Sequence, residues 1–267
     1  MISFNHLGNL GRLANQMFQY ASLKGIAKKR GYDFIIPPKN LFGVQDNKVK
    51  NSDVTLYDVF DIEGKNNIAV IQNPILQERM HTFDKELFEN CPDKVDLFGY
   101  FQTEKYFKHI EDEIRKDFLF KESVIFDCKE SFKENLGDTE AISLHIRRSD
   151  YVTNNNHPVQ DLEYYEKSLN VLSKDLPVLV FSDDTDWCQT QSFFKPDRFF
   201  ILEGNGTEID LCMMSLASYH IIANSSFSWW GAWLANSKHI IGPKNWFSGD
   251  CVNKSVEDMS FANFEFL

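Results

Sequence analysis

The sequence predicts an α/β protein built on parallel β-sheet, chiefly from the alternation of strands and helices in its second half. Short apolar runs that read as strands occupy residues 141–146, 178–181, 199–202, 220–223 and 239–241. Between them lie helical patterns at 162–173, 185–194, 208–218 and 227–235. Alternation of this kind predicts βαβ units and a parallel sheet. The 267 residues, 43% hydrophobic and 25% charged, suffice for one large domain or two small ones.

The first half is also α/β but less regular. Strands are expected at residues 2–5, 33–36 and 95–101, with helices at 15–30 and 103–118. Gly31 is placed to end the first helix and Thr103 to cap the second. The charged stretch at 121–138 is weakly patterned, so we expect the interdomain connection there. The resulting lobes are an N-terminal one at 1–135 and a C-terminal one at 136–267.

Composition excludes several classes of function. Lys plus Arg number 28 and Asp plus Glu 39, a net charge of −11 that would repel a nucleic-acid backbone. No apolar run approaches the ~20 residues that span a bilayer, and the N-terminus shows no signal peptide. Five cysteines are scattered singly, which argues against a disulfide framework or a zinc site. We therefore expect an intracellular, cytoplasmic protein without a transmembrane segment.

Polar residues gather directly after the strands of the second half. Arg147, Arg148 and Asp150 follow one strand, Ser182 to Asp184 the next, and Asn224 to Ser228 open a helix after a third. In open parallel sheets the ligand crevice lies outside the carboxyl ends of the strands. A helix N-terminus and an arginine fork both suit a phosphate. Adjacent residues of an extended chain point to opposite sides, so one arginine is expected to face a phosphate-bearing ligand while the other pairs with an acid such as Asp150.

Other features admit two interpretations. His145 lies between apolar residues of a strand and could orient a neighbour or take part in chemistry. Trp229, Trp230 and Trp233 at helical spacing favour core packing over stacking on a sugar. Asp184-Thr185-Asp186 matches the D-x-D pattern that holds a divalent metal in many glycosyltransferases. With arginine available to neutralise phosphate, we expect no metal, and the two aspartates Asp183 and Asp184 to cap the next helix or bind ligand hydroxyls.

Four motifs together resemble glycosyltransferase family 11, the α-1,2-fucosyltransferases. His145-Ile146-Arg147-Arg148-Ser149-Asp150 resembles the H-x-R-R-x-D signature of inverting fucosyltransferases, and residues 11–21, GRLANQMFQYA, resemble the opening of family 11. Residues 223–234, ANSSFSWWGAWL, are similar to its C-terminal signature, and residues 181–184 and 99–102 fit as well. The resemblance spans nearly the whole chain. Ala14 departs from it, because the family usually has glycine there.

The resemblance implies a GT-B-like fold of two Rossmann-like lobes, with GDP-β-L-fucose on the parallel sheet of the C-terminal lobe and no metal or other cofactor. It implies catalytic roles for Arg148, Asp150 and Asn15. It implies donor-binding roles for Gly11, Arg12, Gln16, His145, Arg147, Ser182, Asp183, Asp184, Asp210, Asn224, Ser225, Ser226 and Phe227. One of the two adjacent arginines would grip the β-phosphate, and Asp210 would read the guanine or its ribose.

The implied reaction is an inverting transfer of L-fucose to the 2-hydroxyl of a terminal β-galactoside on a glycan. Arginine would stabilise the charge on the departing GDP by preorganised electrostatics. Asp150 could act as the base or instead orient an arginine, and Asn15 could position the nucleophile. Two alternatives stay open: an inverting fucosyltransferase of another linkage, and an inactive protein that binds a GDP-sugar or a glycan.

Overall fold

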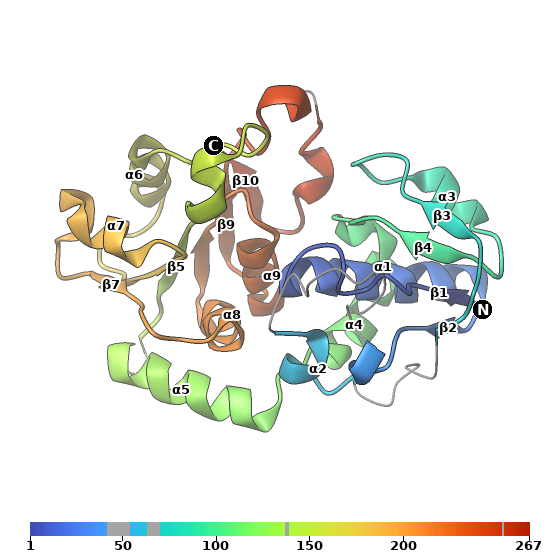
Figure 1. The fold of residues 1–267 in the computed structure, drawn as a ribbon. Coiled ribbons are helices and arrows are strands. Elements are labelled where there is room, and N and C mark those ends of the chain that lie inside the picture. The colour runs from blue at the N-terminus through green and yellow to red at the C-terminus, as the bar shows by residue number, and fades with distance from the viewer. Residues whose placement is uncertain (42–53, 63–69, 137–138, 253) are drawn as a thin grey trace. The chain divides into compact units, whose positions relative to one another are not determined.

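The computed structural model of the chain describes residues 1–41, 54–62, 70–136, 139–252 and 254–267. Two compact units make up this part of the chain, and Figure 1 shows their elements. Unit 1 comprises Met1–Lys121 and Glu257–Met259, and unit 2 comprises Glu122–Val256 and Ser260–Leu267. Each unit has helices around a sheet whose strands all pair in parallel, so the predicted α/β fold class is confirmed.

Unit 1 contains a four-stranded sheet in the order β2-β1-β4-β3. Its strands are β1 (Ile2–Ser3), β2 (Phe34–Ile35), β3 (Ile75–Gln77) and β4 (Asp96–Phe98). Its helices are α1 (Leu13–Arg30), α2 (Leu56–Val59), α3 (Lys85–Asn90) and α4 (Glu111–Asp117). The three strands expected in this half are present but shorter than expected, and β3 was not predicted.

Helix α1 forms where the sequence predicts it and begins two residues earlier. It ends at Gly31, whose φ of 69° places it in the left-handed region and whose N–H bonds the carbonyls of Ala27 and Lys28. Lys28, Lys29 and Arg30 fill the last turn, where positive charge suits the helix dipole. The loop before the helix turns at Gly8 and Gly11, with φ of 89° and 83°. A residue with a β-carbon would be strained at either position.

The prediction of a single helix at 103–118 is wrong. The segment folds as two short 3₁₀ turns, Glu104–Tyr106 and Lys108–Ile110, followed by α4. Thr103 does cap the first turn by accepting a hydrogen bond from the Lys105 N–H at 3.3 Å. Tyr106 and Phe107 are adjacent and both fully buried, so both aromatic side chains enter the core. A regular helix would turn neighbouring side chains to different sides, and tertiary packing overrides the local pattern.

Unit 2 contains a six-stranded sheet in the order β10-β9-β8-β5-β6-β7. The strands are β5 (Ile142–Ile146), β6 (Val178–Ser182), β7 (Phe199–Ile201), β8 (Tyr219–Ile221), β9 (His239–Gly242) and β10 (Phe264–Phe266). The helices are α5 (Glu122–Leu136), α6 (Leu162–Val171), α7 (Thr185–Thr190), α8 (Thr207–Leu216) and α9 (Ser226–Ala235). Numbered along the chain from β5, this is the 3-2-1-4-5-6 order of doubly wound nucleotide-binding sheets. All nine strands and helices expected from 141 to 241 are present.

The boundary between the two units falls at the start of the stretch 121–138, and most of that stretch is helical rather than a connection. Residues 122–136 form the 15-residue helix α5, which belongs to unit 2 and packs against α8. The two units therefore meet in sequence at Lys121 and Glu122, not at residues 135 and 136. Glu257–Met259 also returns to unit 1, where Asp258 accepts a hydrogen bond from the backbone of Phe83.

The core of unit 2 uses the strands and helix α9. All five residues of β5 are buried, and Trp229, Trp230 and Trp233 of α9 are at most 1% exposed. The three tryptophans contact one another, with ring centroids 5.0 to 6.5 Å apart. The prediction that they pack in the core is confirmed. With the strand interiors filled by apolar side chains, polar groups can face a ligand only at the edges of the sheet.

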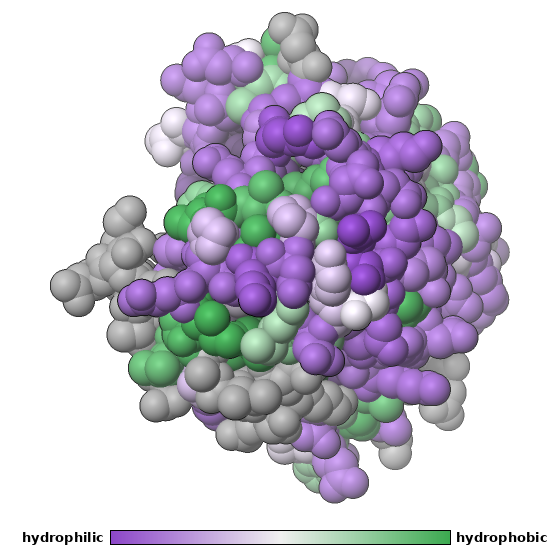
Figure 2. Space-filling view, turned by 90° about the vertical axis from the view of Figure 1, so that its right-hand side faces the viewer, coloured by the Kyte–Doolittle hydropathy of each residue, from purple (hydrophilic) through white to green (hydrophobic). Residues whose placement is uncertain are grey.

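The surface of the protein in Figure 2 is mostly polar. Hydrophilic side chains dominate the face shown in Figure 2, and apolar residues form patches between them. Within the described ranges, no helix is both long and apolar enough to cross a membrane.

Candidate active site

The candidate site lies at the carboxyl edge of the unit 2 sheet, where the strand order reverses. Strand β5 is paired with β6 on one side and with β8 on the other. The chain winds outward from β5 through β6 to β7 and then returns to β8, which makes the ends of β5 and β8 a topological switch point. Ligands of doubly wound proteins bind in the crevice at such a point.

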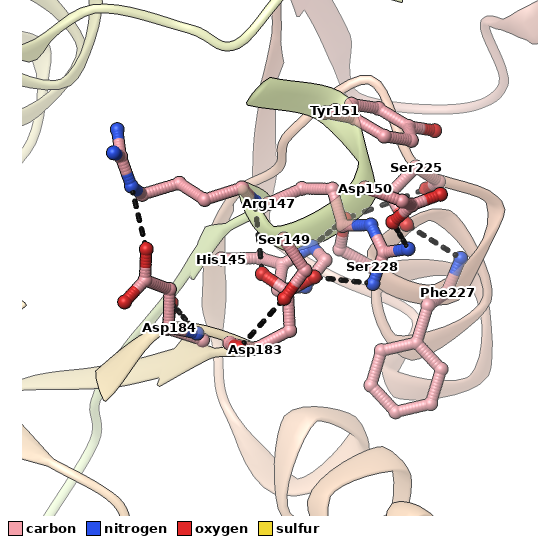
Figure 3. Close-up of polar contacts among 12 residues, drawn as sticks. His145, Arg147, Ser149, Asp150, Tyr151, Asp183, Asp184, Ser225, Phe227 and Ser228 are labelled. Atoms are coloured by element: carbon pink, nitrogen blue, oxygen red, sulfur yellow. Dashed lines mark hydrogen bonds and ion pairs between the residues drawn. The ribbon is translucent and has the colours of Figure 1, made fainter. Parts of the chain in front are cut away.

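Arg147 turns toward the β8 side of this crevice. Its guanidinium carbon lies 5.1 Å from the centroid of the Tyr151 ring, and the Tyr151 hydroxyl donates a hydrogen bond to the Asn224 carbonyl at 3.2 Å. Asn224 stands two residues before α9. Figure 3 shows that Arg147 donates a hydrogen bond to Asp150 on the side of the site where Ser225 and Phe227 lie. Arg147 is therefore connected through Tyr151 to the turn between β8 and α9, while Asp183 after β6 also binds it.

Arg148 turns the other way, toward β6 and α7. Its Nε donates to Asp184 Oδ2 at 3.0 Å, and its guanidinium carbon lies 3.9 Å from the ring centroid of Trp187 on α7. Its backbone N–H donates to Asp183 Oδ1 at 2.8 Å. The prediction that the two arginines face opposite sides is confirmed. The resemblance gave the catalytic role to Arg148, and that role stays a prediction. In the structure it is Arg147 that is connected, through Tyr151, to the β8–α9 turn.

Three carboxylates hold the two guanidinium groups. Arg147 pairs with Asp150 and also with Asp183, whose Oδ2 is 2.6 Å from Nη1, while Arg148 pairs with Asp184. These five side chains carry a formal charge of −1. Both arginines are therefore paired with acids, where the sequence led us to expect one. An anionic ligand at this edge has to exchange places with at least part of these ion pairs.

Helix α9 begins at the same edge with a capped N-terminus. Ser225 is the N-cap residue and its hydroxyl accepts a hydrogen bond from the Phe227 N–H at 3.3 Å. The first turn contains no acidic residue, and Ser226 and Phe227 are half-buried. The free N–H groups and the positive end of the helix dipole suit a phosphate.

His145 supports this helix start from inside β5. Its Nδ1 lies 2.8 Å from the Ser228 hydroxyl, and its ring lies 5.9 Å from the Phe227 ring. Burial, with a smaller effect from the charge of Arg147, lowers the pKa of His145 to about 3. The imidazole is therefore neutral at physiological pH. Of the two interpretations open for His145, the geometry favours the orienting one.

Two predicted donor-binding side chains are directed into the protein. Asn224 is 1% exposed, and its Nδ2 donates to the carbonyls of Pro158 and Trp246, each at 3.0 Å. Gln16 of unit 1 is also 1% exposed, and its Oε1 accepts from the Leu56 N–H at 3.2 Å. The structure gives both side chains a structural role, and their direct contact with a donor stays a prediction.

Asp210 lies at the start of α8, one helix turn from the loop that follows β7. Its Oδ1 accepts a hydrogen bond from Asn205 Nδ2 at 3.1 Å. Burial raises the pKa of Asp210 to about 6, although the Asn205 bond opposes the shift. Glu208 on the same turn has a buried Oε2 without a partner and adds to the rise through its charge. A carboxylate that is short of donors can accept hydrogen bonds from a ligand.

The D-x-D tripeptide is used in part by the protein itself. Asp184 caps α7 by accepting from the Trp187 N–H at 3.2 Å and also binds Arg148, while Asp184 N–H donates to the Ser182 hydroxyl at 3.0 Å. Asp186 is exposed. The capping role expected for Asp184 is confirmed. Among the described residues, no group of three or more potential ligands could hold a metal ion. Independence from a metal stays a prediction.

The predicted residues of unit 1 lie around the start of α1. Arg12 is the exposed N-cap residue, and Asn15 follows in the first turn. Gln102 Nε2 donates to Asn15 Oδ1 at 2.7 Å, which joins the first turn of α1 to the loop after β4. A β-carbon on Gly11 would lie 2.0 Å from Asn15 Nδ2, so only glycine fits there. These contacts fix the Asn15 amide, and its place in catalysis stays a prediction.

Sequence reasoning missed the aromatic residues that support the arginines. Tyr151 and Trp187 lie under Arg147 and Arg148, and the Tyr165 hydroxyl donates to the His145 carbonyl at 3.1 Å. A usable signal exists for Tyr151, because it follows Arg147 by four residues in the turn Ser149–Thr153. Trp187 and Tyr165 lie on other helices, and only the fold brings them to the site.

Solved fucosyltransferases share this fold. The fucosyltransferase NodZ from Bradyrhizobium aligns with a TM-score of 0.59 and 13% identity over 93% of this chain and 96% of NodZ. The structure of POFUT1 in complex with GDP aligns with a TM-score of 0.52 and 15% identity over 88% of this chain and 94% of that one. The fold is thus α/β and GT-B-like, the architecture of a class of glycosyltransferases.

Sequence comparison defines the family. Residues 2–263 match the family described as Glycosyl transferase family 11, and the chain belongs to it. An alpha-1,2-colitosyltransferase of Escherichia coli is 32% identical over 91% of this chain and 92% of its own length. The galactoside alpha-(1,2)-fucosyltransferase 2 of Sus scrofa is 24% identical over 86% of this chain and 69% of its own length. The protein is a glycosyltransferase.

Proposed function

We propose that this glycosyltransferase moves L-fucose from GDP-β-L-fucose to the 2-hydroxyl of a terminal galactose, with inversion at the anomeric carbon and without a metal. The observation that carries the proposal is Arg147 at the end of β5, connected through Tyr151 to the Asn224 carbonyl just before α9, at the switch point of the unit 2 sheet. A guanidinium and a helix N-terminus together form a site for a diphosphate. The 1,2 linkage is supported by the names of the relatives in Escherichia coli and Sus scrofa.

The nucleotide part of the donor would bind near α8. Guanine carries a ring N–H and an amino group, both donors, and a ribose carries two hydroxyls. Asp210 with its raised pKa and the buried Oε2 of Glu208 offer acceptors for such groups. This supports Asp210 as the residue that reads the base or the ribose, as the family resemblance implies.

Arg147 would supply the main electrostatic contribution to the reaction. Cleavage of the bond between fucose C1 and the diphosphate leaves a negative charge on GDP, and a fixed guanidinium stabilises that charge. Removal of one such donor typically costs about 10²–10³ in rate. No metal ion is needed in this scheme, because arginine and the helix N-terminus carry the positive charge.

Asp150 connects the charge on Arg147 to the acceptor chemistry. In the structure it is bound to Arg147, which favours the role of an arginine-orienting acid. When Arg147 turns its N–H groups to a diphosphate, Asp150 loses that partner and its carboxylate is free to take the proton of the attacking hydroxyl. One carboxylate can then serve both roles that the sequence left open.

A closely related donor is the specific alternative. The Escherichia coli relative at 32% identity is named a colitosyltransferase, and colitose differs from fucose only by the absence of the 3-hydroxyl. The diphosphate site would serve both sugars equally. Donor choice then depends on groups that contact the 3-hydroxyl.

A transfer assay decides between these possibilities. GDP release is measured with GDP-fucose or GDP-colitose, with and without lactose, in excess EDTA, and the product linkage is read by NMR. We expect lactose-stimulated release from GDP-fucose that yields Fuc-α1,2-Gal. Release only from GDP-colitose would reassign the donor, a different linkage would reassign the acceptor hydroxyl, and dependence on added Mn²⁺ would restore the D-x-D site.

A further inference from the structure

Arg147 is stacked on a column of two aromatic rings. Its guanidinium carbon lies 5.1 Å from the Tyr151 ring centroid, and on this ring His157 stacks at 5.2 Å with an interplanar angle of 21°. His157 in turn packs against Phe247 at 5.7 Å. Burial lowers the pKa of His157 from its ordinary value, so the ring behind Tyr151 adds no second cation beneath Arg147. A guanidinium over a tyrosine face is attracted by the electrons of the ring.

The Tyr151 ring is itself fixed to the scaffold on both sides of the crevice. It belongs to the turn Ser149–Thr153 that follows β5, and its hydroxyl donates to the Asn224 carbonyl after β8 at 3.2 Å. Burial raises the pKa of Tyr151 to about 12, so the hydroxyl keeps its proton and remains a donor. The side chain of Asn224 extends the same network to the carbonyls of Pro158 and Trp246.

The Tyr151 ring and the two carboxylates contact the Arg147 guanidinium in different ways. Asp150 and Asp183 take N–H groups at Nη2 and Nη1. A phosphate also binds a guanidinium through its N–H edges, so it competes with these carboxylates. The Tyr151 ring lies 5.1 Å from the guanidinium carbon and takes part in neither of these ion pairs. It can therefore hold Arg147 while the edges change partners.

We propose that Tyr151 is a positioning residue, which holds the Arg147 guanidinium at the β8–α9 turn while its N–H groups pass from Asp150 and Asp183 to the diphosphate of the donor. The inference rests on the proposed function, since it assigns the ligand as a nucleoside diphosphate. Tyr151 itself does not bind the ligand. Its effect on binding passes through Arg147.

GDP affinity measured by calorimetry is the first test, because it requires neither acceptor nor turnover. Tyr151→Phe keeps the ring and loses only the hydroxyl bond, so GDP binding should stay within about threefold of wild type. Tyr151→Leu removes the ring face and should weaken GDP about tenfold, the scale of a partly desolvated cation–π contact. Tyr151→Met gives the same test if the leucine variant does not fold. The matched control is Tyr219→Leu. Tyr219 lies on β8 with the Lys238 ammonium over its ring, so this variant also removes a cation–π contact and should leave GDP binding unchanged.

A double-mutant cycle with Arg147→Gln separates positioning from general packing. If Tyr151 acts through Arg147, Tyr151→Leu should weaken GDP less than twofold further once Arg147 is gone. An equal loss in both backgrounds would overturn the proposal, as would GDP binding by Tyr151→Leu within twofold of wild type.

A measurement without ligand keeps the test independent of the proposed function. The NMR signal of the Arg147 Nε–H group, assigned by its absence in Arg147→Gln, should show restricted motion in wild type and in Tyr151→Phe. It should show greater motion in Tyr151→Leu, and unchanged motion there would overturn the positioning role. A wild-type protein that shows this pattern but does not bind GDP would contradict the proposed donor and leave the Tyr151–Arg147 coupling standing.

Discussion

At the scale of single residues, the site is organised by competition for Arg147. The Arg147 guanidinium is bound by Asp150 and Asp183 before any anion arrives, and the five charged side chains at this edge sum to −1. A diphosphate therefore competes with these carboxylates for the arginine. This exchange costs part of the binding free energy, and it also releases a carboxylate at the reacting edge.

The competition predicts opposite effects of Asp150→Asn on binding and on turnover. Loss of the competing charge should tighten GDP binding about three- to tenfold, read by calorimetry, because Tyr151 and Asp183 still hold Arg147. Turnover should fall by about 10² or more if Asp150 takes the acceptor proton. Asp186→Asn makes the same change of charge on an exposed side chain and serves as the control. Weaker GDP binding by Asp150→Asn would contradict the competition.

Asp210 predicts a pH dependence of nucleotide binding. Hydrogen-bond donors of the nucleotide favour the ionised carboxylate, and the pKa of Asp210 is raised to about 6. GDP affinity should therefore rise as the pH increases from 5 to 7. Asp210→Asn should bind GDP weakly and rise less steeply, because only the titration of the terminal phosphate, with a pKa of about 6, then remains. A pH profile of Asp210→Asn that matches wild type would exclude Asp210 as the titrating group.

The raised pKa of Asp210 also makes the stability of the fold depend on pH. Here a higher pH is unfavourable, whereas it favours nucleotide binding. The folded protein holds the Asp210 proton more tightly than the unfolded chain does, so stability falls as the pH rises between about 4 and 6. Asp210→Asn should remove this loss and unfold at a higher temperature than wild type at pH 8. The gain should be about 1–2 kcal/mol, because a pKa unit corresponds to about 1.4 kcal/mol and the half-buried side chain keeps part of its hydration.

At the scale of elements, the N-termini of the helices in unit 2 position much of the site. Asp161, Asp184 and Ser225 cap α6, α7 and α9, each by accepting a backbone N–H two or three residues on. These local signals could be predicted from the sequence, since such side chains are preferred N-caps. They fix where a helix begins and so which N–H groups face the crevice.

Ser225→Ala tests the start of α9. Loss of the N-cap bond should cost about 1 kcal/mol and lower the midpoint of thermal unfolding by about 2–4 °C. Ser225→Thr keeps a hydroxyl and should stay close to wild type. Ser226→Ala, one residue further and half-buried, should also have little effect. A Ser225→Ala protein with an unchanged midpoint would show that the helix start does not depend on this cap.

Elements were predicted well where the pattern is local and poorly where packing decides. Strands β5 to β9 and the helices between them follow from short apolar runs and caps. Strands β3 and β10, each three residues long at a sheet edge, were not predicted. Helix α5 was taken for a connection because its sequence is charged and weakly patterned, and the 103–118 segment is broken because Tyr106 and Phe107 both enter the core.

At the scale of the whole molecule, the order of strands decides what the sequence left open. The sequence places Arg147 and Arg148 after the same strand and on opposite sides, but it does not say which side is the crevice. The pairing of β5 with β8 on one side and β6 on the other answers that question. Because strand order depends on contacts far apart in the sequence, neither the choice of arginine nor the bond from Tyr151 to the Asn224 carbonyl could be predicted without the structure.

The most direct test of the proposed diphosphate site compares GDP binding by Arg147→Gln and Arg148→Gln. The two variants lose the same charge from adjacent residues, and each guanidinium is stacked on an aromatic ring and paired with an acid. We predict that Arg147→Gln weakens GDP binding about 100-fold and abolishes measurable transfer, whereas Arg148→Gln weakens GDP less than tenfold. Equal losses, or a larger loss for Arg148→Gln, would contradict the placement of the diphosphate between β5 and β8.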